Sequence, residues 1–336
     1  MTPRQIGRDD HDGFGRPPRR TRPRTKDRPD YSAAAVGVVV AVDRGRLTVV
    51  LDGRDTGRRI TATKARALGR KAAIVGDKVR VVGDTSGAQG TLARIVEVLP
   101  RATVLRRTAD DDDPYERPIV ANADQLAIVT ALADPPPRTG MIDRILVAGY
   151  DAGLVPLLVL TKADLASADD LTALYADLGV PSIAVEPGVD LTDLRERLTG
   201  HHTVFVGHSG VGKSTLVNAL IPEAERSTGQ VNAVTGRGRH TSTSAVALEL
   251  PSPGGWVIDT PGVRSFGLAG VTTDSILAAF DDLAVIVEDC PRGCQHDSAA
   301  VGCALDPAAA HGHVNPDRVE SFRRMERAWL VPDTSP

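Results

Sequence analysis

The chain has 336 residues and a net charge of −3, which suits two or three domains. Aromatic residues make up only 3% of it, so its cores must be built from aliphatic side chains. It has no apolar run of about 18 residues that would span a membrane, and its N-terminus lacks the apolar core of a secretory signal. Three cysteines are too few for a disulfide framework. These features exclude a membrane-spanning or disulfide-stapled protein, and we expect a cytoplasmic location.

Positive charge is concentrated at the N-terminal end of the chain. Residues 1–30 carry nine Lys/Arg against five Asp and almost no apolar side chains, which predicts a disordered basic tail. Residues 32–105 carry thirteen Lys/Arg against six Asp/Glu, so the remainder of the chain is acidic. This asymmetry favours a polyanionic partner over the alternative of an ordinary charged surface.

Residues 31–105 are predicted to form a small β-barrel. Five β-rich runs, at 35–42, 47–53, 59–63, 78–82 and 91–98, fit an antiparallel five-stranded barrel of the OB-fold type. No aromatic residue lies between Ala33 and Leu105, so base stacking is not expected. Contacts with nucleic acid would be made mainly to phosphates by basic residues such as Arg58, Arg59, Lys64, Arg66, Arg70 and Lys71.

A linker at 106–117, with an acidic run and Pro114, is expected to separate the barrel from a second domain at 118–270. Strands and helices alternate in that domain, which indicates a parallel sheet with helices on both faces. Strands are expected at 125–131, 155–160, 182–185, 203–206, 245–250 and 256–258, and helices at 141–152, 170–178, 191–198 and 214–220. Ligands of such sheets bind at the carboxyl ends of the strands.

The run GHSGVGKST at Gly207–Thr215 fits the phosphate-loop pattern and follows a predicted strand. Loops of this spacing place backbone N–H groups around the phosphates of a nucleotide. We assign Lys213 to the β- and γ-phosphate oxygens, in a catalytic role, and the Ser214 hydroxyl to Mg²⁺. The remaining nucleotide-binding residues of the loop are Gly207, His208, Ser209, Gly210, Val211, Gly212 and Thr215.

The sequence Thr161-Lys162-Ala163-Asp164 follows another predicted strand and is similar to the guanine-reading pattern N-K-x-D. The Asp164 carboxylate would accept hydrogen bonds from guanine N1–H and the 2-amino group, a pair of donors that adenine lacks. The stem of Lys162 would cover the base. Thr161 replaces the usual Asn, and its hydroxyl can still bond the backbone of the phosphate loop. The alternative is a strand-end turn without function.

Two further segments are candidates for Mg²⁺ binding and for a mobile switch. Asp259-Thr-Pro-Gly262 reads D-x-x-G at a strand end, where Asp259 can hold Mg²⁺ through water and the Gly262 amide can sense the γ-phosphate. The polar run 235–243 lies where GTPases carry a mobile switch, and Thr241 or Thr243 would complete the Mg²⁺ coordination. We assign Thr241 to Mg²⁺, although the sequence does not separate the two threonines, and a flexible surface loop remains the alternative.

All three cysteines lie within fourteen residues, at Cys290, Cys294 and Cys303, with His296 between them. Thiolates and an imidazole at this spacing favour tetrahedral Zn²⁺, and four protein ligands would make the site structural. The alternatives are unrelated buried cysteines, or ligation by His311 and His313 instead.

The motifs occur in a permuted order, because the base-reading motif precedes the phosphate loop instead of following the D-x-x-G. With GHSGVGKST, GRGRHTST, DTPG and the cysteine cluster, the sequence resembles the RsgA (YjeQ) family of ribosome small-subunit-dependent GTPases from residue 34 to about 330. The family spaces its ligands as C-x4-C-x-H-x5-C, whereas this chain has C-x3-C-x-H-x6-C.

The resemblance implies an OB-fold, a circularly permuted GTPase domain and a C-terminal zinc-binding domain, which we place at 271–336 and expect to be mainly helical. It also implies binding to the small (30S) ribosomal subunit and its rRNA. GTP hydrolysis to GDP and phosphate, stimulated by that subunit, would serve late subunit maturation. We further expect a monomer.

Val263 follows the D-x-x-G where Ras-like GTPases have a water-orienting Gln, so we expect slow intrinsic hydrolysis. His240 is the candidate to align the water once the ribosome orders the switch, and Arg237 or Arg239 could act as a cis arginine or contact rRNA. The alternatives are a phosphate-loop ATPase, from which Asp164 would distinguish a GTPase, and a GTP-binding rRNA scaffold without significant turnover.

Overall fold

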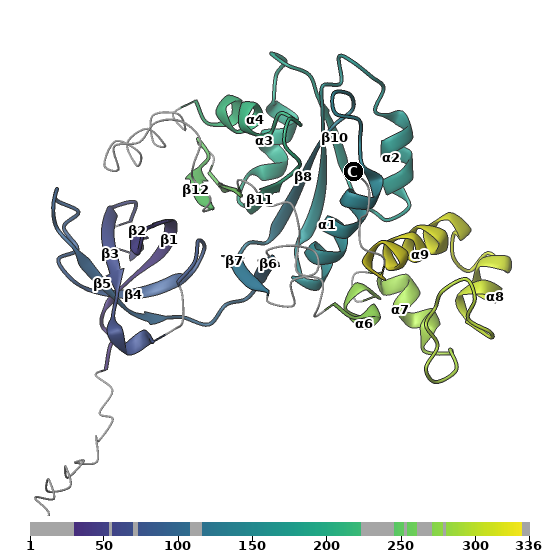
Figure 1. The fold of residues 1–336 in the computed structure, drawn as a ribbon, viewed down its shortest axis with the longest axis horizontal. Helices are drawn as coiled ribbons and strands as arrows, with labels where there is room; N and C mark the ends of the chain where they lie inside the picture. Colours follow the sequence, from purple (N-terminus) through teal and green to yellow (C-terminus); the bar gives the residue numbers. More distant parts are fainter. Residues whose placement is uncertain are drawn as a thin grey trace, which may run out of the picture. The chain divides into compact units, whose positions relative to one another are not determined.

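The computed structural model describes residues 30–53, 56–69, 73–107, 116–222, 245–251, 254–260, 271–277 and 280–330. The described residues 30–33 belong to a unit separate from the one that starts at residue 34, and all the elements below, which are labelled in Figure 1, belong to the latter. The predicted tail falls almost entirely outside the described residues. Within the described part of the chain, no helix has the length and apolar character needed to cross a membrane.

The first five strands close into a barrel. They are β1 (Ala35–Asp43), β2 (Arg46–Leu51), β3 (Arg59–Lys64), β4 (Lys78–Gly83) and β5 (Ala93–Val98). They pair in the order β1-β2-β3-β5-β4, and β4 returns to β1. Alternate residues such as Val39, Val49 and Ile95 fill the interior. This confirms the five-stranded barrel, but β3 and β5 run parallel, so the expectation of a wholly antiparallel barrel was wrong. A 3₁₀ turn and β4 lie between β3 and β5 in sequence. Strand β5 can therefore run in the same direction as β3, which a direct hairpin would not allow.

A two-stranded ladder lies at the expected linker. Strands β6 (Val104–Arg107) and β7 (Arg117–Ala121) pair antiparallel, so Arg106, Arg107 and Arg117 lie in strands that the sequence did not predict, and residues 108–115 lie outside the described part of the chain. Leu105 and Val120, which flank the charged segment and pair across the ladder, are both buried, and their burial favours the two strands. The domain boundaries themselves stay a prediction.

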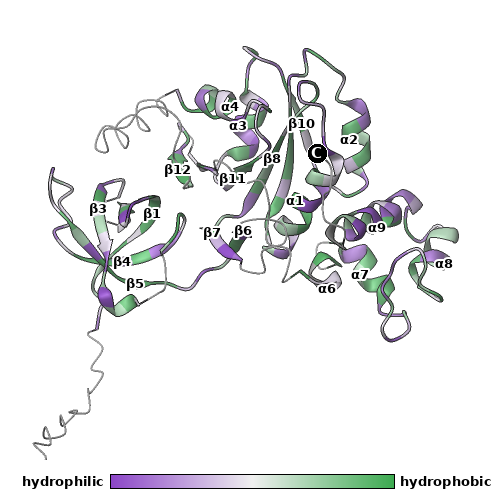
Figure 2. Ribbon diagram, viewed as in Figure 1, coloured by the Kyte–Doolittle hydropathy of each residue, from purple (hydrophilic) through white to green (hydrophobic). Residues whose placement is uncertain are grey.

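The central sheet has the strand order β10-β9-β8-β11-β13-β12. Its strands are β8 (Gln125–Ala131), β9 (Val155–Thr161), β10 (Ser182–Val185), β11 (His202–Val206), β12 (Val246–Glu249) and β13 (Trp256–Asp259). All pair parallel except β12, which runs antiparallel at one side. Every residue of β8 is buried, as expected for a central parallel strand covered on both faces, and the strand is coloured as hydrophobic in Figure 2.

Helices cover both faces of this sheet because alternate strand residues point in opposite directions. On one face, Leu126 and Val204 share a core with α1 (Thr139–Asp151) and α2 (Asp169–Ala176). On the other face, Ala127 and Phe205 share a core with α3 (Thr192–Leu198) and α4 (Lys213–Leu220). The four helices and six strands start within about two residues of the positions expected from periodicity.

The described residues of the C-terminal region form helices, apart from a segment without regular secondary structure at 288–304. It contains α6 (Thr273–Leu277), α7 (Asp281–Val287), α8 (Leu305–Ala310) and α9 (Pro316–Leu330), and it joins the core of α1 and α2 (Figure 1). Phe280 packs edge-on against Tyr150 and Phe322. Arg324 of α9 forms an ion pair with the buried Asp143 of α1 at 3.0 Å. The helical character expected after residue 271 is thus observed.

Candidate functional site

The phosphate loop connects β11 to α4 at the carboxyl edge of the sheet, and its glycines are required there by the backbone. Gly210 and Gly212 have φ of +84° and +88°, a region that side chains disfavour. A Cβ on Gly207 would lie 2.3 Å from the carbonyl oxygen of Val129. The loop therefore lies tightly against β8. Ser209, Gly210, Ser214 and Thr215 are exposed along it, whereas Val211 is buried in the core beneath α4.

Lys213 and Asp259 meet at the same edge. The Lys213 ammonium donates to the Asp259 carboxylate and, at 3.3 Å, to the backbone oxygen of Thr260. The two residues lie on neighbouring elements because β11 and β13 are adjacent parallel strands. Their side chains are 11% and 25% exposed, so a phosphate could reach both from solvent. Hard oxygen donors such as Asp259 and Ser214 suit Mg²⁺.

Thr161 ties the expected base-reading motif to the phosphate loop. Its buried hydroxyl donates to the backbone oxygen of Val211 at 2.5 Å and lies 3.2 Å from that of Thr130. The expectation that Thr can bond the loop in place of Asn is confirmed at this contact.

Lys162 adopts a left-handed backbone conformation with φ of +57°. Its ammonium donates to the backbone oxygen of Asp134, which precedes a cis proline, Pro135. Asp164 follows in the loop with an exposed side chain. The turn thus directs the Asp164 carboxylate away from the core and toward solvent. In that position it is accessible to the base of a nucleotide.

A cleft of about 460 Å³ opens between these two motifs. Thr161, Lys162, Gly212 and Thr215 contribute to its lining. The opposite wall comes from the loop that follows β10, at residues 185–191. The volume falls in the range of small-molecule sites.

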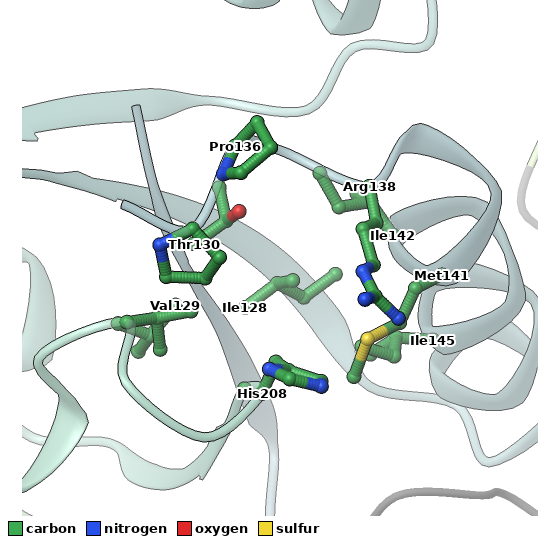
Figure 3. A pocket seen from close by; sticks show the side chains of 12 residues that line it. Ile128, Val129, Thr130, Pro136, Arg138, Met141, Ile142, Ile145 and His208 are labelled. Atoms are coloured by element: carbon green, nitrogen blue, oxygen red, sulfur yellow. The ribbon is translucent and has the colours of Figure 1, made fainter. Parts of the chain in front are cut away.

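His208 lies on a different side of the loop. It contributes to a pocket of about 20 Å³ together with Arg138, Met141 and Ile145, and Figure 3 shows its ring beside the side chains of α1. That volume is close to the space of a single water molecule. The His208 ring thus lies in this small pocket, and its Nδ1 is 2.8 Å from the backbone oxygen of Ser209.

The predicted metal ligands form a second cluster. Cys290, Cys294, His296 and Cys303 place one ligand atom each within 4.8 Å of one another. His296 Nδ1 lies 3.5 Å from Cys290 Sγ and 3.9 Å from Cys303 Sγ. Ligands bound tetrahedrally at about 2.0–2.3 Å would lie roughly 3.3–3.8 Å apart, so the two His296 distances are close to those of a bound ion.

Burial shapes the titration of this cluster. It lowers the pKa of His296 and keeps the imidazole in the neutral form that ligates metals. Burial and the neighbouring thiols raise the pKa of Cys303 to about 11. Thiolates in this environment need a nearby positive charge, which a bound cation would supply. His311 and His313 pair with each other at 6.1 Å between ring centroids and are not members of the cluster.

Several predicted residues lie outside the described residues. They are His240, Thr241 and Gly262, the further candidates Arg237, Arg239, Thr243 and Val263, and the basic residues Arg70 and Lys71.

Two features of the sites were missed from the sequence. The loop 185–191 has no sequence motif of its own. Its position directly after a strand end indicates a ligand-binding loop, because ligands of such sheets bind at the carboxyl ends of the strands. Arg323 of α9 donates to the backbone oxygen of His296 at 2.9 Å and pairs with Asp306 at 2.8 Å. It thereby supports the metal-ligand loop from a distant helix, a contact that no local pattern reveals.

Comparisons with known proteins agree with this architecture. A family model described as RsgA GTPase matches residues 98–269. The chain is 42% identical over 249 residues to "Small ribosomal subunit biogenesis GTPase RsgA" of Pseudomonas aeruginosa (strain LESB58), covering 71% of this chain and 72% of the relative. The protein of the same name from Pseudomonas syringae pv. tomato is 41% identical over 71% of each chain.

Two solved structures are similar. The crystal structure of YjeQ from Thermotoga maritima has a TM-score of 0.63 at 27% identity, covering 89% of this chain and 99% of that one. The structure of YloQ, a circularly permuted GTPase, has a TM-score of 0.64 at 22% identity, covering 91% and 98%. The latter shows the fold, including the permuted order of the strands. Since the family model spans half of the chain and the relatives are aligned over more than two thirds of their length, the chain belongs to the RsgA GTPase family and is a hydrolase acting on GTP.

Proposed function

We propose that the cleft between the phosphate loop and the Thr161–Asp164 loop holds GTP during hydrolysis to GDP and phosphate. The observation that supports this most is the hydrogen bond from Thr161 to Val211, which joins the two motifs at one edge of the sheet. The alternative of an ATPase is not retained, because the family acts on GTP.

Each residue of the site has a role in this proposal. The loop amides and Lys213 neutralise phosphate charge, and Asp164 selects guanine. Ser214, Asp259 and Thr241 would hold Mg²⁺, which supplies further positive charge at the phosphates when bound. When the nucleotide binds, the Lys213 ammonium must leave the Asp259 carboxylate and donate to phosphate oxygens instead. Gly262 would sense the γ-phosphate, and His240 would align water.

The second part of the proposal concerns the partner. Relatives at 42% identity are named small ribosomal subunit biogenesis GTPases. We infer that this chain also acts on the small ribosomal subunit in late maturation, in the cytoplasm and as a monomer. Exposed Arg58, Arg59 and Arg66 on the barrel are suited to rRNA phosphates.

We infer further that Cys290, Cys294, His296 and Cys303 bind one Zn²⁺ in a closed, structural site. The soft donor set and the ligand spacing favour Zn²⁺ over the harder cations.

Single-turnover GTP hydrolysis with and without small ribosomal subunits tests the proposed function. We expect slow turnover by the chain alone, because Val263 cannot position water, and acceleration of roughly 10²-fold or more with subunits. His240→Ala should lose the acceleration while GDP affinity is retained. An unchanged stimulated rate in that variant would remove His240 from the mechanism.

The same assay addresses the remaining alternative. GTP binding without turnover under either condition would identify a scaffold in which the nucleotide is structural. In a parallel competition assay, excess GTP but not ATP should displace a labelled guanine nucleotide. Asp164→Asn should weaken that preference by about tenfold, which is the cost expected for losing one charged hydrogen-bond acceptor.

A further inference from the structure

Arg195 of α3 contacts the helix that carries the phosphate loop. Its guanidinium donates to the backbone oxygens of Leu220 at 2.8 Å and Ala219 at 2.9 Å, at the last turn of α4. The last carbonyls of a helix have no intrahelical partner and carry the negative end of its dipole. A bidentate guanidinium satisfies two of them with charge of the right sign.

The same arginine lines the 460 Å³ cleft. One wall of the cleft is formed by Thr215, Leu216 and Ala219 of α4, and the other by the loop after β10. That loop leads directly into α3, whose start is held by Asp190, since the Thr192 hydroxyl and amide both donate to its carboxylate. Arg195 therefore connects the two walls at the end of the cleft remote from Lys213.

Apolar packing alone does not determine this separation. Leu194 and Leu198 of α3 share a core with Leu216 and Leu220 of α4. Aliphatic contacts of this kind tolerate small sliding movements, whereas two hydrogen bonds to fixed backbone oxygens set both the distance and the register.

We propose that Arg195 is a positioning residue for the guanine nucleotide. By fixing α4 relative to the loop 185–191, it sets the width of the cleft that receives the base and ribose. The inference rests on the proposed binding of GTP in this cleft. Because Arg195 acts at the base end and not at the γ-phosphate, its loss should weaken nucleotide binding and leave the chemical step intact.

The test compares the wild-type chain with Arg195→Met, which keeps an unbranched apolar stem but removes the guanidinium donors. The measurements are the Kd of fluorescently labelled GDP, and KM and kcat for GTP with saturating small subunits. We expect Kd and KM to rise about tenfold in Arg195→Met while kcat stays within about twofold. Arg195→Lys, which keeps the charge but lacks the planar fork that reaches both backbone oxygens, should give intermediate values. Arg197→Met, on the exposed side of the same helix, should match wild type.

A purely structural role of Arg195 predicts a different pattern. It would lower the melting temperature and the active fraction of Arg195→Met without changing KM, and this result would overturn the proposal. A fall in kcat at constant KM would also overturn it. If Asp164→Asn weakens GDP binding but Arg195→Met does not, only the role of Arg195 fails. If Asp164→Asn has no effect, the location of the nucleotide fails as well.

Discussion

The hydroxyl of Thr161 connects two loops from different parts of the chain through one hydrogen bond. It lies fifty positions from Val211 in sequence and bonds its backbone oxygen directly. An asparagine, usual at this position, would span the same gap with an amide. The shorter threonine suffices here because β8 places β9 and the phosphate loop close together, and a Cβ on Gly207 would already collide with Val129.

At the scale of this residue, Thr161→Val should weaken GDP binding by about fivefold. The substitution keeps the shape but leaves the Val211 oxygen without its donor, at a cost of about 1 kcal/mol. Equilibrium titration with labelled GDP measures this change. Thr161→Ser, which keeps the hydroxyl, serves as the control, and equal affinities of the Val variant and wild type would contradict the assigned role.

Cys303 is the most buried of the predicted metal ligands and offers a sharp test of the cluster. We expect one zinc per chain by elemental analysis, and Cys303→Ser should lose it because a hydroxyl is a poor ligand for this ion. His311→Ala should retain the metal, since that side chain is not in the cluster. Loss of zinc from His311→Ala instead would mean that the ligand set is wrong.

At the scale of elements, α9 is held to α1 by an ion pair whose carboxylate is almost completely buried. The Asp143 side chain is 2% exposed, and Arg324 also lies over the ring of Tyr175 at 5.3 Å. Removing one partner of such a pair leaves a charge in a low-dielectric environment. The pair thus makes the docking of α9 depend on both residues together.

Arg324→Met should therefore destabilise the fold by about 3 kcal/mol near neutral pH, measured from urea unfolding midpoints. Asp143→Asn combined with Arg324→Met should recover part of this loss, because no charge then remains buried. A double variant no more stable than Arg324→Met would contradict the explanation.

The pH dependence of this loss follows from the pKa of Asp143. Burial raises that pKa, against the opposing effect of Arg324, so the folded state binds a proton more readily than the unfolded state does. The penalty for the charged carboxylate is present at neutral pH and disappears as the pH falls through the folded-state pKa. The cost of Arg324→Met should thus be smaller at about pH 5 than at about pH 7.5. An equal cost at both values would exclude this origin.

At the scale of the whole molecule, α9 connects three regions. Its Arg324 pairs with α1, its Arg323 supports the metal-ligand loop at His296, and its Glu326 accepts a 2.8 Å hydrogen bond from the Thr273 hydroxyl of α6. Thr273 lies close in sequence to the D-x-x-G that is proposed to sense the γ-phosphate. A change at that phosphate therefore has a short covalent route to α6 and from there to α9.

We expect hydrogen exchange in α6 and α9 to differ between the GDP-bound and GTP-analogue-bound chain. The barrel strands β4 and β5 should show no difference and provide the internal control. Thr273→Val, which removes the hydroxyl, should reduce the difference in α9 while that in α6 persists. Identical protection of α9 with both nucleotides would show that the C-terminal helices do not respond to the nucleotide.

The sequence by itself determined the features that depend on neighbouring residues. The phosphate-loop pattern of Gly207–Thr215, the alternating strands and helices and the predicted metal ligands could each be read from a short segment, and the permuted order could be read from the succession of the motifs along the chain. The helices were placed correctly for the same reason, since periodicity is local. At Arg106 and Arg117 the charged composition did not indicate a strand, but β6 and β7 pair there as neighbouring strands.

Only the tertiary structure decided which distant side chains meet. The bond of Arg195 to α4, the pairing of Asp143 with Arg324 across 181 positions and the support of His296 by Arg323 have no sequence signature. The parallel closure of the barrel by β3 and β5 is of the same kind. Such contacts depend on how whole elements pack, and an arginine on a helix has the same local pattern whether it faces solvent or caps a neighbouring helix.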